Sequence, residues 1–165
     1  MKTQELGRKS GEMLIFGGVY SNLQALEKLH AIAIESNISP ENIICTGDIV
    51  GYCAQPEESL RFIREWACGC NFDKGTRCDV FSRNWYPIAY QAVSDEMKTW
   101  LRDMPAFIRF EYAGNQGLVL HGGLKDVSQF IFKSTEWSVK QQILIETNAD
   151  FILAGHCGLP FADAL

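Results

Sequence analysis

The sequence has little basic charge, with 15 lysines and arginines against 20 aspartates and glutamates and a net charge of −5. The basic residues are scattered along the chain, so the concentrated positive surface of a nucleic-acid-binding protein is not expected. No apolar run is long enough to cross a bilayer, and the opening MKTQELGRKSGEM lacks the apolar core of a signal peptide. We therefore expect a cytoplasmic protein whose partner is a small molecule or another protein, with no role for nucleic acid or membrane.

Histidine is also scarce, with three residues, whereas cysteine is not, with six. Because no export signal is apparent, we expect a reducing compartment and interpret the cysteines as thiols or metal ligands. Cys68, Cys70 and Cys78 form a C-x-C-x7-C cluster, which predicts either a zinc site completed by a distant ligand or a loop of buried thiols. Cys157 is next to His156 and is placed to reach a metal held by that histidine.

The length and composition predict one domain. The 165 residues, 47% of them hydrophobic, suffice for a single core, and we interpret the polar, aperiodic residues 1–12 as a tail before a domain over 13–165. The segment after Trp66, rich in cysteine, glycine and charge, is expected to be a loop. Apolar runs predict strands over 13–16, 43–46, 107–112, 117–120 and 151–154, and helical spacing with capping residues predicts helices over 22–36, 55–66, 94–103 and 136–148.

Three of these predicted strands are followed by a residue that can bind a metal, namely Asp48, His121 and His156. In open α/β sheets, ligands bind at the carboxyl ends of strands, and converging Asp and His side chains are typical of metal-dependent hydrolytic sites. The alternative is that Asp48 is a turn residue and that the two histidines are structural. His30, on a helix face, is interpreted as structural or solvated.

Four segments carry a family resemblance. GGVYSNLQALEKL, CTGDIVGYCAQPEE, LVLHGG and ILAGHCGLPF resemble, in order, the motifs of calcineurin-like metallophosphoesterases. The resemblance covers nearly the whole chain and implies an α/β sandwich of mixed sheets flanked by helices, incomplete at the C-terminus. It also implies that Asp48 bridges two metals, while His121 and His156 belong to the second metal.

The chain departs from the family pattern at the first metal. The family's ligands for that ion fall at Gly18, Tyr20 and Gly158, so GGVYSN stands in place of the Asp-x-His motif, as in a variant branch of the family. A neutral phenol with a pKa of about 10 is a poor ligand for a divalent ion, so Tyr20 is not expected to replace the missing side chains.

The family's Gly-Asn-His-Asp motif can be aligned in two ways. In one, CNFD stands in its place, which keeps Asn71 as a metal ligand and puts Phe72 where the general acid should be. In the other, Cys-Gly-Cys matches a downstream segment of the variant branch, and the motif and its preceding strand are missing. The second is favoured because ACGC contains no apolar strand. Either alignment lacks the general acid, whose contribution is about a hundred- to ten-thousandfold in rate.

These observations predict a metal-dependent phosphoester hydrolase with a degenerate site. The predicted ligands are Asp48, His121, His156 and Asn71, holding at most one divalent ion, Mn, Fe or Zn, and acting slowly on a small phosphoester. The alternative is a catalytically inactive pseudoenzyme that binds or scaffolds a protein partner. Because members of the family continue beyond the final motif whereas this chain ends at Leu165, we also expect an exposed sheet edge and self-association.

Overall fold

Two β-sheets form the centre of the computed structural model, which describes residues 2–67, 69–70 and 82–164. One sheet has the strand order β1-β5-β6-β7, and only its β5–β6 pair is antiparallel. The other sheet has the order β2-β3-β4 and is parallel throughout. The strands are β1 (Thr3–Lys9), β2 (Leu14–Phe16), β3 (Ile43–Cys45), β4 (Gly69–Cys70), β5 (Phe107–Tyr112), β6 (Asn115–Leu120) and β7 (Phe151–Ala154).

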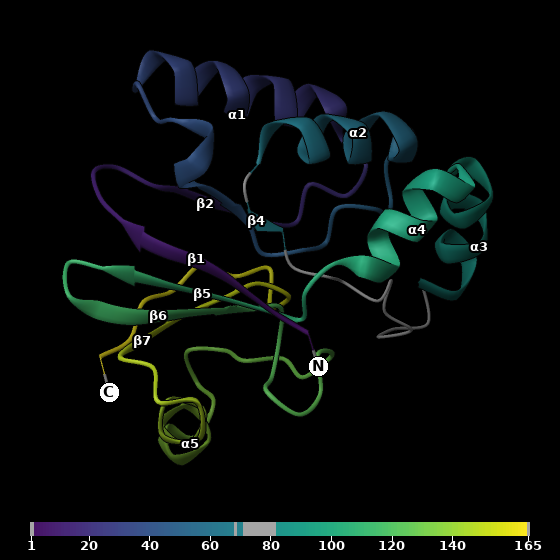
Figure 1. Ribbon diagram of the computed structural model, residues 1–165. Helices are drawn as coiled ribbons and strands as arrows, with labels where there is room; N and C mark the ends of the chain where they lie inside the picture. Colours follow the sequence, from purple (N-terminus) through teal and green to yellow (C-terminus); the bar gives the residue numbers. More distant parts are fainter. Residues whose placement is uncertain (1, 68, 71–81, 165) are drawn as a thin grey trace.

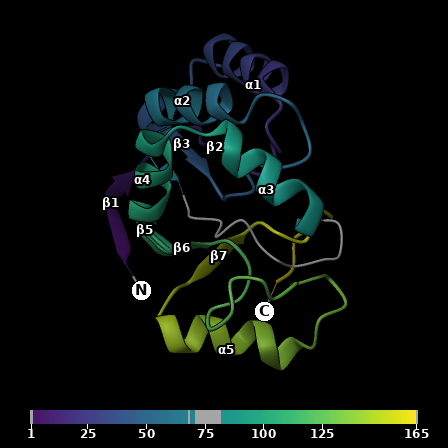
Figure 2. The ribbon, with the colours of Figure 1, turned by 90° about the vertical axis from the view of Figure 1, so that its right-hand side faces the viewer.

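Helices cover the outer faces of both sheets, so the molecule has four layers (Figure 1). Helices α1 and α2 lie over the three-stranded sheet and α5 lies beyond the four-stranded sheet, as the view in Figure 2 also shows. The helices are α1 (Leu23–Glu35), α2 (Pro56–Trp66), α3 (Ser82–Ala92), α4 (Asp95–Asp103) and α5 (Trp137–Thr147), with a short 3-10 turn at Pro40–Asn42. This arrangement confirms the expected α/β fold with sheets flanked by helices. No helix in the described part of the chain is both long and apolar enough to pass through a membrane.

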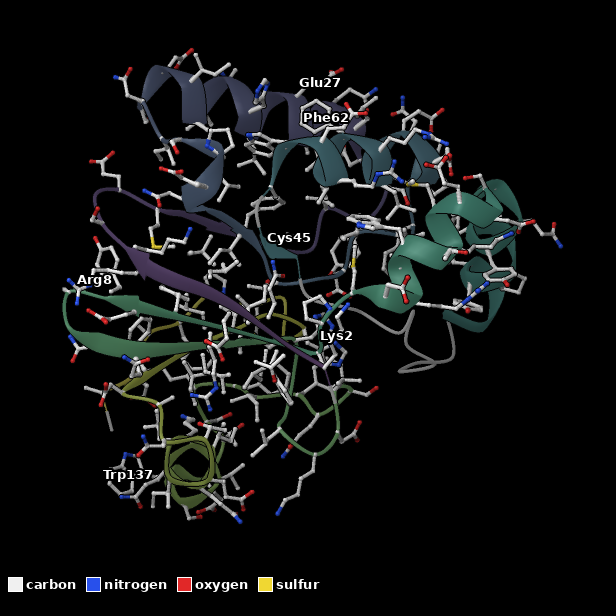
Figure 3. The ribbon with its side chains drawn as sticks, in the orientation of Figure 1. Lys2, Arg8, Glu27, Cys45, Phe62 and Trp137 are labelled. Atoms are coloured by element: carbon white, nitrogen blue, oxygen red, sulfur yellow. The ribbon has the colours of Figure 1, made fainter. Side chains whose placement is uncertain are left out.

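Alternation along the strands divides the core between the layers, because successive side chains of a strand point to opposite faces. In β3, Ile43 and Cys45 pack with the helical layer, whereas Ile44 between them packs against the other sheet. Figure 3 shows Cys45 below α1 and α2. In β6, Leu118 and Leu120 belong to the cluster that includes Ile143 of α5, whereas Val119 lies between the sheets. The inner strands β3 and β6 are therefore buried on both faces.

The first residues of the chain correct the sequence analysis, which expected a polar tail over residues 1–12. Residues 3–9 instead form β1, which pairs in parallel with β5 at the edge of the four-stranded sheet. Arg8 forms an ion pair with Glu111 of β5 at 2.9 Å. Polar side chains are common on edge strands, where one face and one edge meet water. The partner strand is a hundred residues away in the sequence, so local hydrophobic periodicity does not reveal this pairing.

The segment after α2 gives a second correction. Gly69–Cys70 forms β4, parallel to β3, so the strand that the sequence analysis judged missing after Trp66 is present. Two residues carry too little periodicity to be recognised, and their backbone pairing with β3 defines the strand. Helix α3 was not predicted either, and it contains Pro87 within its length. Residues 71–81, including Asn71, Phe72 and Cys78, lie outside the described residues, as does Cys68.

The predicted helix starts are confirmed in atomic detail. Asn22 caps α1 by accepting a hydrogen bond from the backbone N–H of Ala25 at 3.0 Å, and Ser94 caps α4 in the same way through Met97. Ser94 in turn donates its backbone N–H and its hydroxyl to the carboxylate of Glu57, at 2.9 and 2.8 Å. The first turn of α2 is thereby tied to the start of α4.

Candidate metal centre

Asp48, His121 and His156 lie at the carboxyl ends of three strands, β3, β6 and β7, and the structure brings their side chains together. One potential ligand atom from each lies within 4.8 Å of the others. Asp48 and His121 are buried, and His156 is half-buried. The two sheets therefore contribute to one site, since Asp48 comes from the three-stranded sheet and both histidines from the four-stranded sheet.

Backbone carbonyls fix the orientation of both imidazole rings. His121 donates from Nδ1 to the carbonyl oxygen of Thr46 at 2.8 Å, and His156 donates from Nε2 to the carbonyl oxygen of Ser128 at 3.1 Å. Because a carbonyl can only accept, each contact assigns the proton of a neutral ring to the nitrogen that faces away from the site. His121 Nε2 and His156 Nδ1 are left with lone pairs directed into the site.

These two inward nitrogens are 3.1 Å apart, and Asp48 Oδ1 is 3.5 Å from His121 Nε2. Two lone pairs at this separation repel each other, and the nearby carboxylate adds negative charge. A cation between the three atoms would remove the conflict. Burial, and then the positive charge that His121 carries when it is protonated, lower the pKa of His156, which favours the neutral imidazole that a metal requires. The ring of Phe130 also stacks on His156, with centroids 4.2 Å apart.

The strand-end turns hold unusual backbone conformations. Asp48 and His156 both have positive φ, at 55° and 63°, and each such residue costs on the order of 1–3 kcal/mol unless the surroundings hold it. Gly47 has φ of 106°, and a Cβ there would lie 2.5 Å from His121 Nδ1. Glycine at this position therefore permits the close approach of the His121 ring to the loop that carries Asp48.

Tyr20 also belongs to the site, although no role was predicted for it from the sequence. Its phenol donates a hydrogen bond to Asp48 Oδ2 at 3.2 Å, so it lies beside the group formed by Asp48, His121 and His156. Its position in GGVYSN, the segment that resembles the first motif of calcineurin-like metallophosphoesterases, was the signal that could have identified it. The carbonyls of Thr46 and Ser128 carry no such signal, because every residue has one.

The remaining histidine and the cysteines considered in the sequence have different outcomes. The thiol of Cys157 donates to the carbonyl of Leu159 at 3.2 Å and is not part of the metal group. His30 packs edge-to-face against Phe62 and Trp66, with centroids 5.5 and 5.3 Å apart, in agreement with its structural interpretation. Asn71 and the cluster of Cys68 and Cys78 lie outside the described residues, and only the backbone of Cys70 is described.

The chain has a sequence relative whose function is uncharacterized. No family model matches the chain. An uncharacterized protein of Methanocaldococcus jannaschii is 26% identical over 163 residues, which cover 91% of this chain and 63% of that protein. The chain therefore spans less than two thirds of the length of this curated relative.

Three solved structures share the arrangement of layers. A hypothetical protein from Pyrococcus horikoshii gives a TM-score of 0.71 at 13% identity, covering 90% of this chain and 70% of that one. A metallophosphoesterase from Sphaerobacter thermophilus gives 0.60 at 20% identity, covering 87% and 59%. A protein described as a putative diadenosine tetraphosphatase gives 0.55 at 18% identity, covering 74% and 55%. The chain has a metallophosphoesterase-like fold, with a group of one Asp and two His at its strand ends.

The residues of this group fit a divalent ion. Zinc with ligands at about 2.0–2.1 Å in a tetrahedron separates those ligands by roughly 3.4 Å, close to the 3.1 and 3.5 Å found for the two pairs that involve His121. The third pair, Asp48 with His156, lies within 4.8 Å. Two imidazoles and one carboxylate suit Zn, Mn or Fe. The carbonyls that accept from the outer imidazole nitrogens supply the orienting contacts that metal-binding histidines usually have.

Proposed function

We propose that this protein binds one divalent metal ion through Asp48, His121 and His156 and slowly hydrolyses a phosphoester there. The observation that carries the proposal is the pair of imidazole nitrogens 3.1 Å apart, both oriented inward by backbone carbonyls, with the Asp48 carboxylate 3.5 Å from His121 Nε2. Only a proton or a metal ion reconciles these groups. Two of the structurally similar proteins support phosphoester chemistry, because one is described as a metallophosphoesterase and the other as a putative diadenosine tetraphosphatase.

The side chains have distinct roles in this proposal. His121 and His156 present neutral nitrogens, and Asp48 supplies the negative charge that offsets the ion. When bound, the ion would polarise a phosphoryl oxygen and lower the pKa of a water to about 7. Burial of Asp48 and His121 lowers the local dielectric and strengthens these electrostatic interactions.

The expected rate is low because no histidine remains to protonate the leaving group. The chain has three histidines, two of which are in the proposed ligand set, and His30 packs in the helical layer against Phe62 and Trp66. Loss of a general acid costs about a hundred- to ten-thousandfold in rate. The same observation favours the second candidate function, a pseudoenzyme that keeps the metal but binds a partner without turnover.

Asn71 remains a predicted fourth ligand. It follows β4 directly in the sequence, and the presence of β4 removes the reason for preferring the alignment in which this motif is missing. An amide oxygen is an acceptable ligand for Mn²⁺ and a weaker one for zinc. We expect Asn71→Ala to weaken Mn²⁺ binding more than Zn²⁺ binding in parallel titrations, and equal effects on both ions would contradict this role.

Titration with Mn²⁺ and Zn²⁺ tests the proposal. The parent, the His121→Ala His156→Ala double variant and a His30→Gln control would each be titrated and then assayed for metal-dependent hydrolysis of an aryl phosphate. Binding by the parent and the control, lost in the double variant, supports the metal site, and hydrolysis with the same pattern supports the enzyme. Binding without hydrolysis selects the pseudoenzyme. Equal binding by all three proteins, or none, refutes the site.

A further inference from the structure

The two oxygens of the Asp48 carboxylate have different neighbours. Oδ1 faces His121 Nε2 at 3.5 Å, whereas Oδ2 accepts the hydrogen bond from the Tyr20 phenol at 3.2 Å. The rotation of a carboxylate about its Cβ–Cγ bond is broad and soft, so without a partner for Oδ2 the direction of Oδ1 would be poorly defined. Tyr20 therefore lies where it can fix the orientation of Asp48.

Tyr20 is itself held firmly against the loop that carries Asp48. Its backbone N–H donates to the carbonyl of Asp48 at 3.0 Å, and its carbonyl accepts from the N–H of Cys53 at 2.9 Å. Its φ of 50° is in the left-handed region, which these bonds stabilise. The next residue continues the pattern, because the hydroxyl of the buried Ser21 accepts from the N–H of Gly51 at 2.9 Å.

The ring of Tyr20 is also restricted. A Cβ on Gly18 would lie 3.1 Å from the ring, so the absence of a side chain there allows the ring its position. On another side, Tyr52 packs against it in an edge-to-face arrangement with centroids 5.2 Å apart. Backbone bonds and ring contacts together place the phenol hydroxyl with little remaining freedom, which is the property of a group that orients a ligand.

We infer that Tyr20 is a positioning residue for metal binding: its phenol donates to Asp48 Oδ2 and thereby directs Oδ1 toward the ion held by His121 and His156. The inference rests on the proposed metal site and adds a role for a residue that occupies the place of a family ligand. The phenol stays protonated and outside the ligand set. Removing an orienting contact of this kind costs about 10–100-fold in metal affinity.

A Co²⁺ titration followed by visible and ultraviolet absorption tests this role, using the parent, Tyr20→Phe and Tyr112→Phe. Tyr112 is the matched control, because its phenol also donates a single hydrogen bond, to the carbonyl of Gly11 at 2.8 Å, on strand β5. We expect Tyr20→Phe to weaken Co²⁺ binding about 10–100-fold and to alter the visible spectrum of the bound ion, with Tyr112→Phe matching the parent. Thermal unfolding of the metal-free proteins shows whether each variant keeps the fold.

The outcomes separate this inference from the proposed function. Unchanged affinity in a folded Tyr20→Phe variant, with binding still lost in the His121→Ala His156→Ala double variant, overturns the role of Tyr20 alone. A tyrosinate ultraviolet signal that appears when the parent binds Co²⁺ and is absent in Tyr20→Phe also overturns it, because Tyr20 would then be a ligand. Failure of the parent to bind Co²⁺ overturns both.

Discussion

Replacement of Gly47 by alanine tests whether the turn after β3 shapes the candidate site. The added Cβ would lie 2.5 Å from Nδ1 and 3.2 Å from Cε1 of His121, well inside ordinary contact distance. The ring must move, and its hydrogen bond to the carbonyl of Thr46 must lengthen or break. Loss of a buried hydrogen bond costs about 1–3 kcal/mol, and a non-glycine residue at positive φ costs a further ~1–2 kcal/mol. We expect Gly47→Ala to lower the free energy of unfolding by about 2–5 kcal/mol.

The control for this prediction is Gly114→Ala in the β5–β6 turn. Gly114 also has positive φ, 82°, but a Cβ there would have no neighbour within 4 Å. Only the cost of a non-glycine residue at positive φ, about 1–2 kcal/mol, therefore applies. Urea unfolding measures both variants, and Co²⁺ or Zn²⁺ titration measures the site. We expect metal affinity to fall about 10–100-fold for Gly47→Ala and not for Gly114→Ala. Equal destabilisation of the two variants, with unchanged metal affinity in both, would refute the reasoning.

Three further predictions concern pH and packing. Burial, and then the positive charge of a protonated His121, lower the pKa of His156 below its ordinary value of 6.5, so the unfolded chain binds that proton first as pH falls. Urea titrations should therefore show the stability of the metal-free protein falling as pH drops below 6.5 and levelling off once the native ring is protonated, with a slope below the limit of about 1.4 kcal/mol per pH unit because solvent screens the half-exposed ring; His156→Gln should reduce this dependence. Ser59→Ala should leave stability unchanged or raise it by about 1 kcal/mol in thermal unfolding, because the buried Ser59 hydroxyl has no hydrogen-bond partner among the described residues. A clear loss of stability would contradict this prediction. Glu57→Gln should destabilise by about 1 kcal/mol at pH 7 and by less near pH 3. Burial raises the pKa of Glu57, but the hydrogen bonds from Ser94 and the contact with Arg61 together lower it below its ordinary value; the same loss at both pH values would argue against this.

Much of the fold could be predicted because the signals are local. The 94–103 helix was predicted from its serine cap and its periodicity, and the structure has α4 over Asp95–Asp103 with Ser94 as cap. The last strand was predicted at 151–154, where β7 lies. By contrast, β1 and β4 were not recognised, because a polar edge strand and a two-residue strand are defined by their pairing with β5 and β3 rather than by their own side chains.

Part of the candidate site could likewise be predicted from the sequence, and part depends on the tertiary structure. The sequence by itself determined which residues capable of binding a metal follow strands, so Asp48, His121 and His156 were predicted as candidates from their places after apolar runs. Only the tertiary structure decided that Tyr20 donates to Asp48, and that the carbonyl of Thr46 orients His121. These contacts join residues 28 and 75 positions apart. The physical reason is that strand periodicity reports where a side chain starts, whereas the distance between side chains from two sheets depends on how those sheets pack.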